Sequence, residues 1–320
     1  MKILVYGMGG GAAKFIKRMK GTQYSIVGVT DNTATKDGSA FEGVPVLSLE
    51  EGASFDYDRL VICALGHEKE VWERLNNLNY DMQKVIVVSE FYRLFLFRDK
   101  HEKLLERNDL YQFFCEEEHT SMEKWFHYFD VYDTFFRKFR NTDVVICEIG
   151  VCKGGSVQMW KHYFGERATI IGIDINEECR KYKEDHIYIE IGSQEDKKFW
   201  EYIKEKYPRI DILLDDGGHT MTQQIVTFES MFSHISDGGI YLCEDCHTSY
   251  WKEYGGGYKK EDTFIEYSKD WIDDVNGNYF HQPEELPYNT THIAGLHYYD
   301  SMVVIEKRHT DFPFCITLGE

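Results

Sequence analysis

The sequence predicts an α/β protein with two doubly wound units and a helical connector between them. Short apolar runs alternate with helical stretches through the first hundred residues, and the same alternation resumes after residue 141. Alternation of this kind builds a parallel sheet with helices on both faces. The intervening stretch is charged and aromatic at helical spacing. We therefore place the domain boundaries at residues 1–97, 98–141 and 142–320.

The N-terminal unit begins with an apolar strand that runs into a glycine-rich turn from Gly7 to Gly11, and a helix through Phe15 and Met19 follows. Strands are expected at residues 2–7, 25–30, 60–64 and 84–88, with a further helix at 71–78. This order resembles the small Rossmann-like domains that precede some sugar-modifying transferases of polysaccharide pathways. The turn could cradle a nucleotide or an anion, with Asp31 at the ribose, or the unit could serve docking. We favour docking and expect a homo-oligomer, because nothing in this half of the chain is typical of catalysis.

The connector, residues 98–141, carries two apolar faces whose members recur every three or four residues, which predicts helices. The first face comprises Leu104, Leu105, Leu110, Phe113 and Phe114. The second face comprises Trp125, Tyr128, Phe129, Tyr132 and Phe136. Low Pro and Gly content favours helices packed across the junction over a flexible linker.

The C-terminal unit opens with a buried strand at residues 144–149, followed by the turn Gly154-Gly155-Ser156 and a helix. A second apolar strand, residues 169–174, ends at Asp174. Glycines at a strand-to-helix turn let a ligand approach the backbone, and an acid that closes the second strand can bond the two hydroxyls of a ribose. No phosphate-binding G-x-x-x-x-G-K-[ST] loop occurs in the sequence. A cofactor with a ribose but no phosphate chain fits this pattern, and S-adenosylmethionine is one.

Two further apolar runs end abruptly in acidic residues. Asp215 and Asp216 follow the first run, and Glu244 and Asp245 follow the second. Because strand ends in a parallel sheet meet at one edge, these carboxylates would repel one another unless a cation lay between them. Oxygen ligands suit Mg²⁺, Ca²⁺ or Mn²⁺, and His219 adds a group that accepts a proton near neutral pH. The alternative is that the first pair caps the next helix and the second pair faces solvent, and the pattern alone leaves it open.

The end of the unit predicts a helix at residues 264–275 and a hairpin of residues 293–299 and 301–306, an antiparallel final pair on a parallel sheet. The segment 247–260, rich in Tyr, Trp and Gly, follows the second acidic pair. Glycines allow a loop to move and aromatic rings stack on sugars, so we expect an acceptor-binding lid here. Glycines in a surface loop need no such role, so this interpretation has an alternative.

Residues from about 120 to 308 resemble the class I S-adenosylmethionine-dependent methyltransferases. More narrowly, they resemble the Mg²⁺-dependent sugar O-methyltransferases of macrolide and polysaccharide biosynthesis. The matching motifs are Glu148-Ile149-Gly150-Val151, Gly172-Ile173-Asp174-Ile175, Gly192-Ser193-Gln194, Asp215-Asp216-Gly217-Gly218-His219 and Glu244-Asp245. One departure is Gly218, where the family usually has Ser, so a hydroxyl beside His219 is missing.

The resemblance implies a role for each site residue. Mg²⁺ would be held by Asp216, Glu244 and Asp245, with His219 as the general base. The expected contacts to S-adenosylmethionine are Lys124, Tyr128, Glu148, Gly150, Gly154, Ser156, Asp174, Ile175, Ser193, Gln194 and Asp215. The expected contacts to the acceptor are His247, Tyr250 and Trp251. The implied reaction methylates a sugar hydroxyl, on a nucleotide-linked sugar or a glycan for capsular or other surface polysaccharide.

Composition limits the partners. The formal net charge of −19 argues against nucleic acid, whose phosphates need basic patches, and against an anionic membrane surface. No apolar run is long enough to span a membrane, and the N-terminus breaks into glycines too early for a signal peptide. The eight cysteines are therefore expected to be reduced thiols in the cytoplasm. Cys243 and Cys246 form a C-x-x-C pair, but no second pair completes a tetrahedral zinc site.

Two other functions stay open at this point. The first is a methyltransferase for a catechol or another small diol, which would use the same chemistry. The second is a dinucleotide-binding oxidoreductase or a scaffold that uses both Rossmann-like units. Binding of radiolabelled S-adenosylmethionine, compared with binding of NAD(H), distinguishes these classes.

Overall fold

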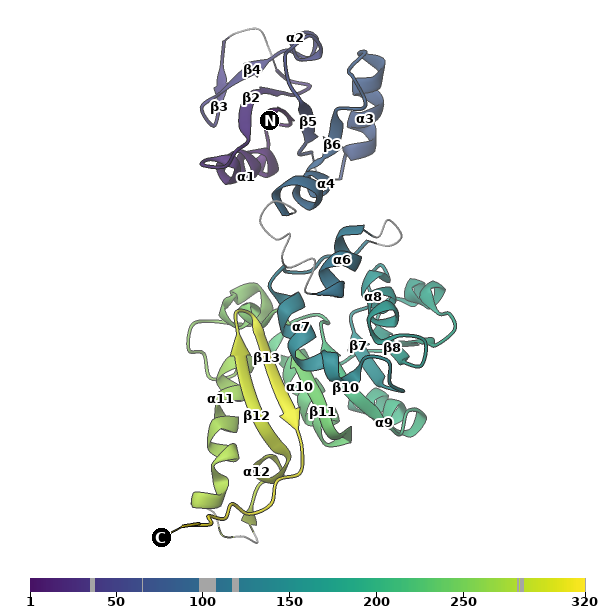
Figure 1. Cartoon of the computed structure of the whole chain (residues 1–320), viewed down its shortest axis with the longest axis vertical. Coiled ribbons are helices and arrows are strands. Elements are labelled where there is room, and N and C mark those ends of the chain that lie inside the picture. Colours follow the sequence, from purple (N-terminus) through teal and green to yellow (C-terminus); the bar gives the residue numbers. More distant parts are fainter. Residues whose placement is uncertain are drawn as a thin grey trace. The chain divides into compact units, whose positions relative to one another are not determined.

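The computed structural model describes residues 1–34, 38–64, 66–97, 108–116, 121–280, 282 and 285–319. They form two compact units, Met1–Leu105 and Glu106–Glu320; the elements of each unit are labelled in Figure 1. Leu104 and Leu105, which the sequence assigns to a helix, lie outside the described residues. Among the described helices, none is both long and apolar enough to cross a bilayer.

The N-terminal unit contains a six-stranded sheet in the order β3-β4-β2-β1-β5-β6. Its strands are β1 (Lys2–Tyr6), β2 (Ser25–Thr30), β3 (Ala40–Phe41), β4 (Val44–Leu47), β5 (Arg59–Ile62) and β6 (Val85–Val87). Its helices are α1 (Gly10–Met19), α2 (Leu49–Ala53), α3 (Glu68–Asn77), α4 (Val88–Phe91) and the π-helix η1 (Tyr92–Phe97). All four predicted strands are present, whereas the antiparallel β3–β4 pair was not predicted because its strands are too short for a periodic pattern.

The central strand β1 shows why this unit is doubly wound. Its successive side chains point to opposite faces of the sheet. Ile3 and Val5 pack in one core with Phe15 of α1, while Leu4 packs in another with Leu75 of α3. Each face of the sheet therefore buries its own apolar layer beneath helices.

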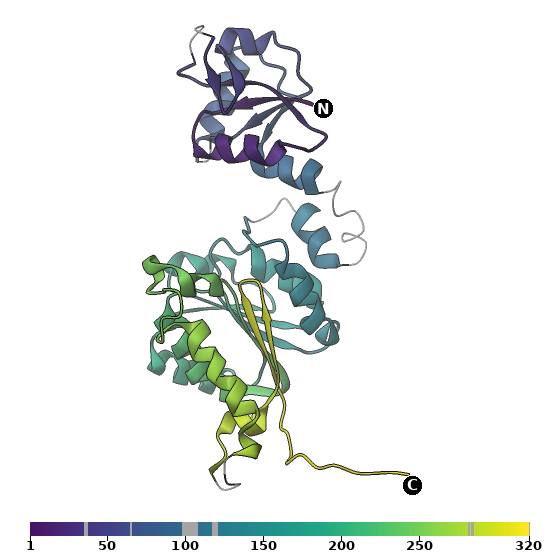
Figure 2. The ribbon, with the colours of Figure 1, turned by 90° about the vertical axis from the view of Figure 1, so that its left-hand side faces the viewer.

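The C-terminal unit contains a seven-stranded sheet in the order β12-β13-β11-β10-β7-β8-β9. Its strands are β7 (Val145–Ile149), β8 (Thr169–Asp174), β9 (Ile187–Ile191), β10 (Ile210–Asp215), β11 (Ile235–Cys243), β12 (Ile293–Tyr299) and β13 (Met302–Lys307). The strands from β9 to β11 pair in parallel, and β13 pairs antiparallel with both β11 and β12. The predicted antiparallel final pair is thus confirmed; Figure 2 shows it, with the chain leaving β13 as an extended segment.

Helices cover the C-terminal sheet. They are α6 (Asp109–Glu116), α7 (Tyr128–Phe136), α8 (Gly155–Phe164), α9 (Lys197–Lys206), α10 (Met221–Met231), α11 (Phe264–Val275) and α12 (Tyr288–His292). One sheet face packs on Trp200 of α9, Phe228 of α10 and Trp271 of α11, in a core that also contains Cys243 and Cys246. The helices predicted around Phe113 and Tyr132 are present as α6 and α7.

The order of the strands determines where a site can form. The chain passes from β7 outward through β8 to β9 and then returns to β10 on the other side of β7. Loops at the carboxyl ends of β7 and β10 therefore diverge, and a crevice opens between them at this switch point.

Candidate active site

A cavity of about 970 Å³ lies at the carboxyl ends of β7, β8 and β10. Seven of the eleven residues expected at the cofactor line it: Lys124, Gly150, Ser156, Asp174, Ile175, Ser193 and Gln194. The predicted metal ligands Asp216 and Asp245 and the predicted base His219 line it as well. The motifs of the sequence therefore meet around one space.

Two glycines shape the turn after β7 for reasons of backbone geometry. Gly150 and Gly154 have φ angles of +97° and +79°, which L-residues with side chains rarely adopt. A Cβ on Gly150 would collide with the carbonyl oxygen of Asp216, and one on Gly154 would lie 2.5 Å from the ring of Tyr182. From the sequence, these glycines were expected to let a ligand approach the backbone. In the structure, their positive φ angles and their contacts with Asp216 and Tyr182 are sufficient to require glycine.

Asp174, at the end of β8, anchors two loops. Its Oδ2 accepts a hydrogen bond of 2.9 Å from the backbone N–H of Cys152, and its Oδ1 accepts one of 2.8 Å from that of Asn176. The next residue, Ile175, is 75% exposed at the rim of the cavity. The carboxylate is therefore held in a fixed orientation beside the cavity.

Glu148 and Asp215 lie beneath the cavity and support residues that line it. The hydroxyl of Ser156 donates to Glu148 at 2.8 Å, and the amide of Gln194 donates to Asp215 at 3.0 Å. Both carboxylates are buried, and burial raises the pKa of each to about 7. Neither residue is among those that line the cavity, so a direct contact with the cofactor stays a prediction.

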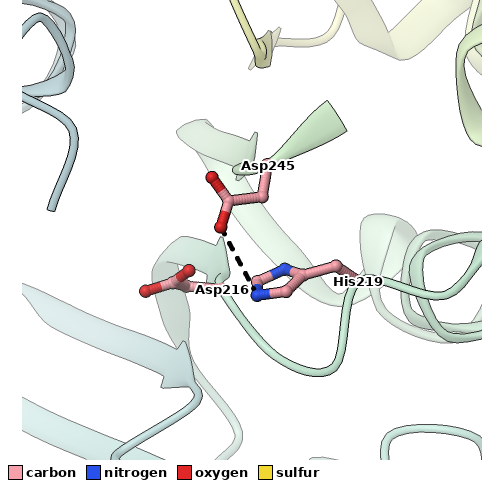
Figure 3. Close-up of side chains that lie close together, drawn as sticks. All are labelled: Asp216, His219 and Asp245. Atoms are coloured by element: carbon pink, nitrogen blue, oxygen red, sulfur yellow. Dashed lines mark ion pairs between the residues drawn. The ribbon is translucent and has the colours of Figure 1, made fainter. Parts of the chain in front are cut away.

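Asp216, His219 and Asp245 form a compact group, and Figure 3 shows the imidazole of His219 directed toward the carboxylate of Asp245, with Asp216 beside them. One ligand atom from each lies within 4.8 Å of the others. The Nε2 atom of His219 is 3.5 Å from Oδ2 of Asp245. The capping alternative is wrong, because the side chain of Thr220 caps α10 by accepting from the N–H of Gln223.

The backbone at this group is strained. His219 and Asp245 have φ angles of +58° and +53°, and Cys152 on the glycine-rich turn has +50°. Residues other than glycine hold such conformations only where the surrounding structure imposes them, and they concentrate at functional sites. At His219, the hydroxyl of Thr248 donates to the backbone carbonyl at 2.8 Å.

Glu244 lies outside this compact group and pairs instead with Lys124. The ammonium nitrogen of Lys124 lies 3.0 and 3.2 Å from the two carboxylate oxygens of Glu244 and also contacts Oδ2 of Asp216. Burial alone would lower the pKa of Lys124, but the neighbouring carboxylates outweigh it and raise this pKa. Burial and the charge of Asp216 raise the pKa of Glu244. From the sequence, Lys124 was expected to contact the cofactor. In the structure, it also forms ion pairs with Asp216 and Glu244.

Helix α7 supports the two carboxylates that follow β11. The hydroxyl of Tyr128 donates to Asp245 at 2.6 Å, and that of Tyr132 donates to Glu244 at 2.5 Å. The spacing of four residues places both tyrosines on one face of the helix. From the sequence, Tyr128 was expected at the cofactor and Tyr132 on an apolar helix face. The signal in the sequence that could have identified Tyr132 as a site residue was its spacing of four residues from Tyr128.

Aromatic side chains gather beside the acidic group. The ring of His247 lies 4.4 Å from that of Trp251 and 5.4 Å from that of Trp125, and Trp125 lines the cavity. We call Trp125, His247 and Trp251 the aromatic platform. His247 and Trp251 were predicted at the acceptor, whereas Trp125 was predicted only as part of an apolar helix face, although its side chain is 52% exposed.

Neither His247 nor Tyr250 is among the residues that line the cavity. His247 Nδ1 is 2.5 Å from the hydroxyl of Ser301, and Tyr250 is about half exposed. The segment that follows folds back on itself through hydrogen bonds from Gly256 to Trp251 and from Gly257 to Ser249. The lid function of residues 247–260 stays a prediction.

Comparison with known proteins gives two family matches. Residues 1–86 match the family described as C2185-like, N-terminal, and residues 147–246 match the family described as Methyltransferase domain.

Several relatives are O-methyltransferases, among them two for rhamnosyl tetracenomycin C in Streptomyces olivaceus, each 30% identical over about 200 residues. Demethylmacrocin O-methyltransferase of Streptomyces fradiae is 34% identical over 194 residues, which cover 55% of this chain and 47% of that protein. Mycinamicin VI 2''-O-methyltransferase of Micromonospora griseorubida is 34% identical over 200 residues, which cover 56% of this chain and 48% of that protein. The chain spans about half the length of the curated relatives it matches.

A solved structure is similar as well. The MycE methyltransferase from the mycinamycin biosynthetic pathway, in complex with Mg, SAH and mycinamycin VI, matches with a TM-score of 0.56 and 28% identity. The match covers 72% of this chain and 63% of that chain. The similarity to sugar O-methyltransferases that the motifs indicated is thereby confirmed, together with the class I fold of the C-terminal unit.

Proposed function

We propose, from the class I methyltransferase domain that this chain contains, that the protein transfers a methyl group from S-adenosylmethionine to a sugar hydroxyl with the help of Mg²⁺. The observation that carries the proposal is the group of Asp216, His219 and Asp245 at the wall of the cavity. The names of the relatives support a sugar as acceptor, and the similar MycE structure is a complex with Mg and SAH.

The cavity fits S-adenosylmethionine, which supplies the methyl group as a reactive electrophile. Asp174 already accepts one backbone hydrogen bond on each oxygen, but a carboxylate oxygen has a second lone pair. Both oxygens can therefore accept from the ribose hydroxyls as well. Ile175 offers an exposed apolar surface beside them for the adenine, and Glu148 and Asp215 hold Ser156 and Gln194 in place at the cavity.

The donor set fits Mg²⁺, which prefers carboxylate oxygens. Asp216 and Glu244 already converge on a cation, the ammonium of Lys124, and Asp216 lies close to Asp245. Asp216, Glu244 and Asp245 would hold the metal, and bound Mg²⁺ would lower the pKa of a coordinated sugar hydroxyl.

In this scheme His219 takes the proton of the reacting hydroxyl on Nε2. Asp245 lies 3.5 Å from that ring and stabilises the imidazolium that forms, while Tyr128 holds Asp245 through its hydroxyl at 2.6 Å. A positioned general base typically contributes ~10²–10⁴-fold to the rate. His219 therefore accepts the proton, while Asp245 stabilises the resulting charge and Tyr128 positions Asp245.

The aromatic platform is the proposed acceptor surface. The apolar face of a sugar ring stacks on indole rings, and Trp125 and Trp251 are both about half exposed. We infer that the acceptor is a nucleotide-linked sugar of a surface polysaccharide, since the N-terminal unit resembles domains attached to enzymes of such pathways. Because the acidic group repels phosphate, the nucleotide would lie away from it.

The N-terminal unit is proposed to serve docking, in a homo-oligomer. Asp31 accepts from the N–H of Met8 at 3.2 Å, and its Oδ1 accepts from both the N–H and the hydroxyl of Thr33 at 3.1 Å, so this oxygen has no lone pair left for a ribose hydroxyl. Light scattering on the full chain tests the oligomer, and a monomeric mass at micromolar concentration would contradict it.

The test of the proposed function is a screen of acceptors with the full chain, S-adenosylmethionine and Mg²⁺, read by mass spectrometry as the gain of one methyl. One panel contains nucleotide-sugars and the other contains polyketide glycosides. Methylation only in the second panel would replace the proposed acceptor, and methylation only of catechols would exclude a sugar. Binding of NAD(H) without binding of S-adenosylmethionine would overturn the methyltransferase itself.

A chelator arm tests the metal. Activity should disappear in EDTA and return with Mg²⁺ or Mn²⁺, because the carboxylates need a cation to hold the acceptor oxygens. Full activity in the chelator would contradict the metal site.

A further inference from the structure

Lys124 occupies the place of a cation in the proposed metal site. Its ammonium contacts Asp216 and both oxygens of Glu244, and it lies 4.0 Å from Glu148. The lysine side chain is only 3% exposed, and the ring of Tyr132 lies 5.8 Å from the ammonium. Three buried or half-buried acids thus surround one lysine nitrogen.

We infer that Lys124 is an internal counter-ion that competes with the metal and has to withdraw before the metal binds. The inference rests on the proposed function only in taking Asp216 and Glu244 as metal ligands. Mg²⁺ binds carboxylate oxygens at ~2.0–2.1 Å, and the ammonium nitrogen is itself 3.0 and 3.2 Å from the Glu244 oxygens. Two cations on the same oxygens would repel each other strongly in a buried site.

The local structure allows Lys124 to move. Residues 121–125 form neither helix nor strand, and α7 begins only at Tyr128. Lys124 lines the cavity, so its long side chain can swing into that space without disturbing the core. The lysine therefore has a second position available when a metal takes its carboxylates.

Lys124 is followed directly by Trp125, a member of the aromatic platform, which is the proposed acceptor surface. Trp125 packs against His247 and Tyr128, with ring centroids 5.4 and 6.5 Å apart. A shift of the backbone at Lys124 would displace this indole. A withdrawal of Lys124 that also shifted its backbone would therefore link metal binding to the arrangement of the aromatic platform.

The first test compares Mn²⁺ binding, by electron paramagnetic resonance, in the wild type, Lys124→Met, Lys124→Arg and the control Lys153→Met. Lys153 lines the same cavity from the glycine-rich turn, so the control removes an equal charge nearby. If the lysine occupies the site at least ~90% of the time, its removal raises the affinity about tenfold or more. Lys124→Arg, which keeps the charge, and Lys153→Met should bind Mn²⁺ like the wild type.

The second test uses the wild type alone and applies even if Lys124→Met fails to fold. Chemical labelling of lysines, located by mass spectrometry, should show Lys124 protected without metal and labelled with Mg²⁺, while the labelling of Lys153 stays constant. Continued protection of Lys124 at saturating Mg²⁺ would overturn the inference, as would equal or weaker Mn²⁺ binding by Lys124→Met. In those cases the metal would bind at Asp216 and Asp245 without displacing Lys124, and the proposed function would stand. Absence of metal binding in every protein would instead refute the proposed metal site.

Discussion

The cofactor site makes a sharp prediction at Asp174. Replacement by Ala removes both oxygens that we assign to the ribose hydroxyls. Hydrogen bonds to a charged group contribute ~1.5–3 kcal/mol, so the dissociation constant of S-adenosylmethionine should rise about 10- to 150-fold. The proposed contact is therefore large enough to measure by titration calorimetry.

The same substitution also affects stability, because Asp174 holds the N–H groups of Cys152 and Asn176. Two hydrogen bonds to a charged group contribute ~3–6 kcal/mol, which corresponds to a fall in Tm of about 6–24 °C for a domain of this size. Asp174→Asn keeps one acceptor oxygen and should be intermediate in both affinity and Tm.

A matched control separates the two effects. Asp196 is also a carboxylate that accepts from a backbone N–H, that of Lys198 at 2.8 Å, but it caps α9 and does not line the cavity. Asp196→Ala should also lower Tm, by less because it loses a single N–H bond, and should leave cofactor affinity unchanged. Wild-type affinity in Asp174→Ala would mean that the ribose binds elsewhere, and equal losses of affinity in both variants would mean that the effect is only structural.

Three further predictions follow from the geometry of the site. In His219→Ala, kcat should fall at least ~10²-fold while calorimetry shows unchanged S-adenosylmethionine binding; near-normal turnover would make His247 the next candidate for the base. Gly150→Ala should lower Tm by clearly more than Gly238→Ala, since both glycines have positive φ but only Gly150 meets backbone atoms of Asp216, and the clash adds ~1–3 kcal/mol; equal shifts in Tm would refute the clash. For Asp215, whose pKa burial raises from 3.8 to about 7, the folded state binds the proton more tightly than the unfolded state. Stability should therefore fall as pH rises from about 4 to about 7, and urea titrations should show a smaller fall in Asp215→Asn; identical pH profiles would contradict the raised pKa.

The acidic residues could be located from the sequence because the strands before them are apolar and end abruptly. In the structure, β10 and β11 pair in parallel with Asp215 opposite Cys243. Asp216 and Glu244 therefore follow at the same edge of the sheet. The same logic identified Asp174 and the final hairpin, since each depends on a local pattern and on the rules of parallel sheets.

The supports of these acids could not be located in the same way. Lys124 lies 92 residues before Asp216 and 120 before Glu244, and Tyr132 lies 112 before Glu244. No local pattern encodes which carboxylate a distant side chain will meet. The glycine-rich turn shows the same limit, because the sequence indicates that space is needed at Gly150 but not that the carbonyl of Asp216 fills it.

The departure at Gly218 is explained by the neighbouring helix. A Cβ there would collide with the side chain of Gln223, whose amide oxygen accepts from the N–H of Thr220 at 3.1 Å in the capping box of α10. A serine would thus displace Gln223 from its capping position. Without a serine hydroxyl, Nδ1 of His219 has no hydrogen-bond partner within the described part of the chain. On the other side of the ring, Nε2 lies 3.5 Å from Asp245, which stabilises the imidazolium once it forms and whose own position depends on Tyr128. Helix α7, which precedes every methyltransferase motif in the chain, consequently contributes to the proposed base indirectly, through Tyr128 and Asp245.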